Sequence, residues 1–458
     1  MNSVNPQHPW RGELRALLVI GVPMALTQMV QFSINIVDVI MIGQLSATAL
    51  ASAALGQVLF YVLFVAAMGP ALAVAPMVSQ SLGDDPDNLV DPRRSVRMGL
   101  WVVTMITLAF SALFFLVEEF ALFIGQPAEA ATLAEPYVLA LAPGLPFALG
   151  VIVLRNFLAA LERSRVPLLI IIVTTLVNAF LNWLLIYGNW GAPRLELVGA
   201  GIASSLSHAI GFFALVLYIR YERSARRFQL FMNFWRPDWP RVREVASLGW
   251  PITITIAFEA MLFNACVFLM GRIGIDEMAA YQVALNVAAL AFRAPLGLSM
   301  AGGVRVGLMA GARNRPGVRR AATLAIVCSA SVILVFAVPM LLLPETIAGL
   351  YLQTDDVTNI AVLGLVASFL PIAAAFALFD ATQVAAAQAL RGLKDVRLPM
   401  VITGFAYWVV GFPVATWLGL YTTVGALGIW YGLLSGLVVA SVLLVWRLHA
   451  LTRADRLG

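Results

Sequence analysis

The chain has 458 residues, of which 61% are hydrophobic and 12% charged, and its formal net charge is +5. Soluble globular proteins carry about 25% charged residues, so this composition excludes that class. Apolar stretches near the ~20 residues that span a bilayer recur along the chain, as in a polytopic helical membrane protein. The basic charge is explained by membrane topology, and we expect no nucleic-acid partner.

Turn and charge signals divide the chain into twelve expected helices in an all-α polytopic membrane protein. They are expected near residues 14–42, 48–80, 95–125, 133–160, 167–188, 198–220, 244–271, 278–311, 319–343, 358–390, 398–420 and 424–447.

The basic residues predict the orientation. With the N-terminus in the cytoplasm, 24 of the 29 Lys and Arg residues fall on the cytoplasmic side, and only Arg194 and Arg272 fall outside. Such a bias is typical of cytoplasmic loops. We therefore expect a multi-pass protein of the cell inner (plasma) membrane with both termini cytoplasmic.

The second half of the chain repeats the first. The run Gly21–Pro23 (GVP) matches Gly249–Pro251 (GWP) at an offset of 228 residues, and the same offset carries Gly69 onto Gly297. Six spans per repeat predict two parallel, pseudo-symmetric six-helix bundles, an architecture that suits alternating access. The expected domains are an N-terminal lobe (1–220), a cytoplasmic linker (221–243) and a C-terminal lobe (244–458).

The first span carries a polar stripe on one helical face. Its members are Gln28, Gln31, Asn35 and Asp38, spaced three, four and three residues apart. Pro23 precedes the stripe and removes a backbone hydrogen bond, which predicts a kink. Burying a carboxylate at lipid depth is costly, so such groups usually face a cavity and move ions or substrate. Asp38 is therefore a candidate proton or cation switch.

The fifth span places Thr175, Asn178 and Asn182 on one face. Their oxygens, beside a carboxylate, are ligands that a hard cation such as Na⁺ would use. Hydrogen bonding between helices explains the same pattern, and spacing alone does not separate the two interpretations.

Two further carboxylates lie near the middle of spans seven and ten. Glu259 has Thr255 four residues before it, and Asp380 has Gln383 three residues after it. Two acids at one depth can share a proton or a monovalent cation, because two bare charges there would repel each other. Glu259 and Asp380 are thus possible ligands of Na⁺, and no other metal site is expected.

The eighth span carries Gln282, Asn286 and Arg293 on one face. Arg293 is interpreted either as the counter-ion of Glu259 or as an anchor on the cytoplasmic side. Phenylalanine rings in these spans could face cations, although apolar packing is the alternative.

Three segments resemble the multidrug and toxic compound extrusion (MATE) transporters, NorM-type branch, and the resemblance covers residues 14–447. The segments are Val37–Gly43 (VDVIMIG), Phe258–Glu259 (FE) and Asp380–Asp395 (DATQVAAAQALRGLKD). The resemblance implies two six-helix lobes and Na⁺- or H⁺-driven antiport of amphipathic, often cationic compounds.

The resemblance also implies roles for individual residues. Asp38 matches the first-helix carboxylate with Asn178 as its fifth-helix partner, Glu259 and Asp380 match the second-lobe pair, and Gln282 matches a drug-contacting position. Two departures weaken the case for Na⁺ over H⁺. Phe376 stands where some relatives have tyrosine, and Asn182 where some have a second acid.

These observations predict a secondary active multidrug efflux transporter that exchanges drug-like cations for Na⁺ or H⁺ by alternating access. It is expected to be a monomer in the lipid bilayer without a cofactor. The expected cation-coupling residues are Asp38, Asn178, Asn182, Glu259 and Asp380. The expected substrate-binding residues are Gln31, Asn35, Gln282, Asn286, Phe292 and Phe376.

Two alternatives remain open. A flippase for lipid-linked precursors would use cationic residues such as Arg155, Arg293 and Arg305, but the acidic set opposes it. A polytopic membrane enzyme is more remote, because the three histidines are scattered and form no metal-binding motif. We therefore expect no enzyme and no catalytic residues.

Overall fold

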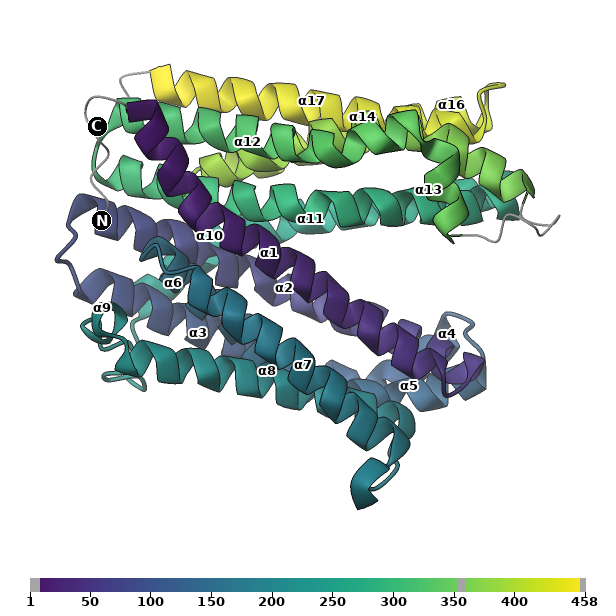
Figure 1. Ribbon diagram of the computed structural model, residues 1–458, viewed down its shortest axis with the longest axis horizontal. Helices are drawn as coiled ribbons and strands as arrows, with labels where there is room; N and C mark the ends of the chain where they lie inside the picture. Colours follow the sequence, from purple (N-terminus) through teal and green to yellow (C-terminus); the bar gives the residue numbers. More distant parts are fainter. Residues whose placement is uncertain (1–8, 352–359, 454–458) are drawn as a thin grey trace. The chain divides into compact units, whose positions relative to one another are not determined.

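The computed structural model describes residues 9–351 and 360–453, and this part of the chain contains helices and no strands (Figure 1). It contains twelve helical segments long and apolar enough to cross a membrane, which confirms the expected number of spans. The six spans of the first repeat are α1 (Pro9–Gly43), α2 (Ala47–Asp84), α3 (Val90–Ser111) with η1 (Ala112–Leu116) and α4 (Val117–Phe123), α5 (Ala128–Leu141) with η2 (Ala142–Gly144) and α6 (Leu145–Ala160), α7 (Arg165–Tyr187) and α8 (Glu196–Tyr221).

The second repeat supplies the other six spans. They are α10 (Trp239–Ile273), α11 (Ile275–Gly311), α12 (Arg315–Leu342), α14 (Ile360–Gly392), α15 (Arg397–Gly404) with the π-helical turn η5 (Phe405–Gly411) and α16 (Phe412–Leu420), and α17 (Ala426–Arg453). Shorter helical segments lie between spans: η3 (Asn189–Gly191), α9 (Arg223–Arg226) and α13 (Pro344–Tyr351).

Local side-chain chemistry explains several helix ends. The Ser46 hydroxyl accepts a hydrogen bond from the Ala49 amide (2.9 Å) at the start of α2, and Asn314 caps α12 in the same way through the Gly317 amide (2.9 Å). Such caps satisfy backbone donors that have no partner inside the helix. Gly188 ends α7 in the left-handed conformation (φ 73°), which glycine adopts without strain.

The described helices form two compact units. Unit 1 comprises Met1–Gln28 with Ile254–Gly458, and unit 2 comprises Met29–Thr253. The division runs through the interior of α1 and of α10, so each of these helices contributes its first part to one unit and its second part to the other. The expected lobes, 1–220 and 244–458, stay a prediction.

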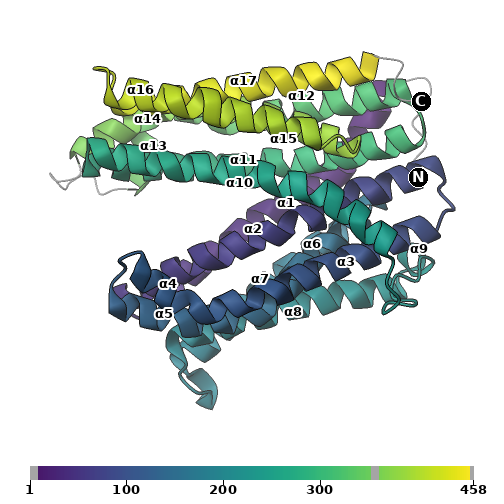
Figure 2. The ribbon, with the colours of Figure 1, turned by 180° about the vertical axis from the view of Figure 1, so that it is seen from behind.

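The core of unit 1 surrounds an aromatic cluster. Within this unit, α14 packs against α11, α12 and α17 (Figure 1), and α16 lies beside α17 when seen from behind (Figure 2). Trp430 is fully buried, with its ring 5.3 Å from that of Tyr281 and 5.8 Å from that of Phe376. Aromatic pairs at these separations add to the stabilisation from apolar burial.

The core of unit 2 holds the segment that follows α8 as well as the spans. Here α2 packs against α3, α5 and α6, and α7 packs against α8. Phe157 of α6 meets Phe228 edge-to-face at 5.4 Å. The Trp101 indole donates a hydrogen bond to the Phe234 carbonyl (3.0 Å). The segment between the repeats is thereby attached to α3 and α6.

One close helix contact occurs once in each unit and follows the sequence repeat. In unit 2, a Cβ on Gly69 of α2 would lie 2.6 Å from the Thr253 nitrogen of α10. In unit 1, a Cβ on Gly297 of α11 would lie 2.3 Å from the Ala25 nitrogen of α1. The two contacts are related by the 228-residue offset, and both require glycine because backbone approaches backbone.

Candidate functional site

Asp38 of α1 lies in a closed ring of polar side chains within unit 2. Its Oδ1 accepts a hydrogen bond from the Asn182 amide (2.5 Å) of α7, and its Oδ2 accepts one from the Ser204 hydroxyl (3.5 Å) of α8. Asn178 closes the ring, because its oxygen accepts from Asn182 (3.3 Å) and its amide donates to Ser204 (3.4 Å). All four side chains are buried. The carboxylate is therefore held by neutral groups.

The structure brings together the three residues expected at this site and adds a fourth. Asn182, rather than Asn178, makes the direct contact with Asp38. Ser204 was not among the predicted site residues, and the serine-rich run in α8 is the signal that could have found it. The Asn182 Oδ1 atom is buried and has no hydrogen-bond partner among the described residues. A buried acceptor without a donor can be satisfied by a cation.

The second acidic site belongs to unit 1. Asp380 of α14 is buried and accepts a hydrogen bond from the Gln383 amide (3.2 Å) one turn later. Glu259 of α10 is half-buried and interacts electrostatically with Asp380 and with Arg391, at the end of α14. The two acids expected to cooperate are thus electrostatic neighbours. Arg391 was not predicted as a neighbour of Glu259, because Arg293 was the only counter-ion considered for that carboxylate.

The expected substrate-binding residues of unit 1 differ in accessibility. Gln282 and Asn286 are exposed on one face of α11, and Phe292 is half-buried further along this helix. Phe376 is 3% exposed and packs between Phe263 and Trp430, both at 5.8 Å. Phe376 therefore contributes to the core, which is a poor position for contact with a substrate.

The expected substrate-binding residues of unit 2 continue the polar stripe of α1. Asn35 is exposed and Gln31 is half-buried. The Gln31 side-chain oxygen accepts a hydrogen bond from Nη1 of Arg155 (2.9 Å), a buried residue of α6. The helix α1 continues through Pro23, which was expected to kink it. The kink stays a prediction.

The first part of α1 is attached to unit 1 by a buried ion pair. The Arg305 guanidinium of α11 donates two hydrogen bonds to the Glu13 carboxylate, each 2.7 Å long. The side chains are 3% and 2% exposed. Bidentate arginine–carboxylate pairs combine charge with fixed geometry, and breaking one inside a protein is strongly destabilising.

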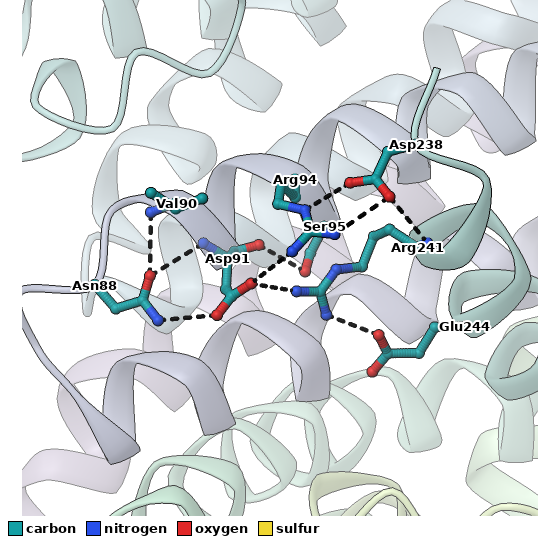
Figure 3. Close-up of polar contacts among 8 residues, drawn as sticks. All are labelled: Asn88, Val90, Asp91, Arg94, Ser95, Asp238, Arg241 and Glu244. Atoms are coloured by element: carbon teal, nitrogen blue, oxygen red, sulfur yellow. Dashed lines mark hydrogen bonds and ion pairs between the residues drawn. The ribbon is translucent and has the colours of Figure 1, made fainter. Parts of the chain in front are cut away.

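The first part of α10 is attached to unit 2 by a more open network (Figure 3). Arg94 of α3 donates to Asp238 (2.5 and 3.2 Å), and Arg241 donates to Asp91 (2.5 Å) and to Glu244 (2.7 Å). The Arg94 hydrogen bond lowers the pKa of the Asp238 carboxyl, which lies just before the span. This network ties α10 to the start of α3.

Comparison with known proteins identifies the family. The MatE family model matches residues 23–184 and 251–417, one block in each repeat. A probable multidrug resistance protein NorM from Rhizobium meliloti (strain 1021) is 41% identical over 97% of this chain and 95% of its own length. A second probable NorM, from Mesorhizobium japonicum, is 39% identical over 96% of this chain and 95% of its own length. The crystal structure titled "MATE in the straight conformation" superposes with a TM-score of 0.87 at 19% identity, over 96% of this chain and 97% of that one. The chain belongs to the MatE family of membrane transporters.

Proposed function

We propose that this protein is a secondary active multidrug efflux transporter of the cell inner membrane. It exports amphipathic, often cationic compounds in exchange for Na⁺ or H⁺, and both termini are cytoplasmic. The Asp38 ring is the observation that carries the proposal. A buried carboxylate beside an amide oxygen that has no hydrogen-bond partner in the described part of the chain is suited to bind and release a monovalent cation or a proton. The names of the NorM relatives support the substrate class.

The mechanism assigns the coupling ion to two sites. In unit 2, a cation would take its ligands from Asp38, Asn182 and Ser204, whereas a proton would bind Asp38 itself. In unit 1, Glu259 and Asp380 repel each other when both are charged, so a proton or cation between them is favoured. An ion drives transport only if it binds one conformation better than the other. Arg391 would compensate Glu259 when the ion has left.

Accessible polar residues on the spans support a substrate pathway. Asn35 on α1 and Gln282 and Asn286 on α11 are exposed within their own units. Exposed amides on a span avoid lipid and instead line water or a partner surface. We therefore propose substrate contacts at Asn35 in unit 2 and at Gln282, Asn286 and Phe292 in unit 1. The proposed transporter is a monomer of two lobes (1–220 and 244–458) that alternate in access. No cofactor takes part in the proposed cycle.

The test is transport by the full chain in proteoliposomes. Uptake of rhodamine 123, a fluorescent lipophilic cation, is followed while a Na⁺ gradient or a pH gradient is imposed separately. We expect at least one gradient to drive uptake and Asp380→Asn to lower that uptake at least tenfold. Protein-free liposomes serve as the control. Absence of driven uptake under both gradients would refute the antiport proposal.

A further inference from the structure

Arg155 is a buried cation with an incomplete set of partners. Its side chain comes from α6 and is 7% exposed. Nη1 donates to the Gln31 side-chain oxygen (2.9 Å), and Nε has no hydrogen-bond partner among the described residues. No described carboxylate forms an ion pair or hydrogen bond with this guanidinium. A guanidinium has five N–H donors, so one neutral amide leaves most of its hydrogen-bonding capacity unused.

The Arg155 guanidinium lies deep in the membrane, where a charged group needs a partner most. Gln31 lies twelve residues before the end of α1 at Gly43, which is about 18 Å along a helix that rises 1.5 Å per residue. The hydrocarbon core is about 30 Å thick, so the bonded guanidinium lies near its middle. Charged side chains at that depth are rare and mark substrate or ion pathways.

A second buried arginine shows what a purely structural arrangement looks like. Arg305 also lies inside a span and is 3% exposed, yet its Nε and Nη2 atoms both donate to the Glu13 carboxylate. Buried charges in proteins are normally compensated in this way. Arg155 has the same burial without the compensation, so its positive charge is available to an incoming anion.

The surroundings of Gln31 provide an approach to this charge. Asn35, one turn further along α1, is exposed, and Gln31 itself is half-buried. An exposed amide on a span is poorly suited to contact lipid, so this face of α1 is the side from which a polar ligand would approach Gln31. Nε and Nη2 form one edge of the guanidinium, which is the edge that grips a carboxylate through two parallel hydrogen bonds.

We infer that Arg155, oriented by Gln31, is an anion-recognising subsite that binds the carboxylate of zwitterionic amphipathic substrates. The inference rests on the proposed efflux function and names the residue that would recognise an acidic group on a substrate. The acidic group binds at Arg155, and the cationic group of the same molecule stays free for the rest of the pathway.

The test uses two probes that differ only at the acid. Rhodamine 110 carries a free carboxylate, and rhodamine 123 is its methyl ester. Binding of each to the purified full-length protein in detergent is measured by fluorescence anisotropy. Arg155→Gln is expected to weaken rhodamine 110 binding at least tenfold and to change rhodamine 123 binding by less than about twofold, since charge-assisted bidentate hydrogen bonds are lost for the acid alone.

Two further variants make the result specific. Arg155→Lys keeps the positive charge but loses the planar guanidinium that donates two parallel hydrogen bonds, so it should weaken rhodamine 110 binding by an intermediate factor. Arg163→Gln removes the same charge from an exposed arginine just after α6, and it should leave both probes unaffected. Arg155→Lys also serves as the decisive variant if Arg155→Gln does not fold.

Three outcomes would overturn the inference. Equal weakening of the binding of both probes would show that Arg155 has a structural role. No change in either affinity would show that Arg155 takes no part in binding. Displacement of rhodamine 110 by phosphatidylglycerol, but not by free acetate, would assign the anion to a lipid headgroup. The efflux proposal fails separately, through absent gradient-driven uptake of rhodamine 123, because the ratio of the two affinities is measured without transport.

Discussion

The helices α1 and α10 occupy equivalent places in the two repeats, but they differ in how their first parts are attached and in the groups that surround their carboxylates. Both have 35 residues, and each carries an internal proline, Pro23 or Pro251, before the point where it passes from one unit to the other. Each is attached near its start by ion pairs, and each carries a carboxylate in its second part. The repeat thus preserves the backbone plan of both helices.

The side chains of α1 and α10 differ in charge. At the start of α1 a buried arginine–glutamate pair makes the attachment, whereas α10 uses a network of partly exposed groups. Further along, Asp38 has neutral partners, whereas Glu259 has an acid and an arginine as neighbours. A symmetric scaffold therefore supports two chemically distinct ion sites, and each difference can be tested by substitution.

The largest effect is expected at the attachment of α1. Glu13→Leu removes the carboxylate that accepts two hydrogen bonds from the buried Arg305, and we expect a loss of about 3–5 kcal/mol of stability. The double variant Glu13→Leu/Arg305→Met replaces the pair with apolar groups and should recover most of the loss. Thermal unfolding of the detergent-solubilised protein measures both. A double variant as unstable as Glu13→Leu would show that the stability comes from the ion pair itself rather than from avoiding an uncompensated buried charge.

An intermediate effect should separate the two carboxylate sites. Asp38→Asn removes the charged acceptor of the Asn182 hydrogen bond, which is expected to cost about 1.5–3 kcal/mol. Asp380→Asn instead removes a repulsive neighbour of Glu259 and should leave stability unchanged or raise it. Both variants should lower gradient-driven transport at least tenfold, which is about 1.4 kcal/mol. Thermal unfolding and proteoliposome uptake, compared side by side, test the contrast. Equal destabilisation by the two substitutions would contradict it.

The smallest effect is expected at the attachment of α10. Asp238→Asn should lower stability by about 0.2–1 kcal/mol, because the pair with Arg94 is partly exposed. The lowered pKa of Asp238 means that its contribution is fully present above its unfolded pKa of about 4 and is lost as the pH falls through the folded value. The difference from wild type should therefore be constant from pH 6 to 8. The stability difference between Asp238→Asn and the wild type should also become smaller in about 1 M salt. A difference that persists in high salt would show a buried role for this pair.

Much of the fold follows from local patterns in the chain. Hydropathy and basic loops predicted the twelve spans, since lipid forces long apolar helices and these signals are local. Helical periodicity also placed Asn178 and Asn182 on the face that meets Asp38. Gly69 and Gly297 proved to be sites of close backbone contact, which explains why this pair of glycines recurs at the repeat offset.

What could not be predicted depends on contacts between distant residues. Glu13 and Arg305 are 292 positions apart, and no spacing rule links them. The same is true of Arg155 and Gln31, or of the Arg94–Asp238 pair. The surroundings of Phe376 could not be predicted for a related reason, because a phenylalanine on a span looks the same in the sequence whether it faces a substrate or Trp430.

The glycine contacts at Gly69 and Gly297 bear on how such a chain could have arisen. In each, a helix of one repeat receives the first part of α1 or α10 from the other repeat. A shorter precursor with a single repeat could form the same contact by exchanging that helix end with a second copy, giving a symmetric dimer. Gene fusion would then have joined two already interlocked subunits, after which their ion-binding side chains were free to diverge.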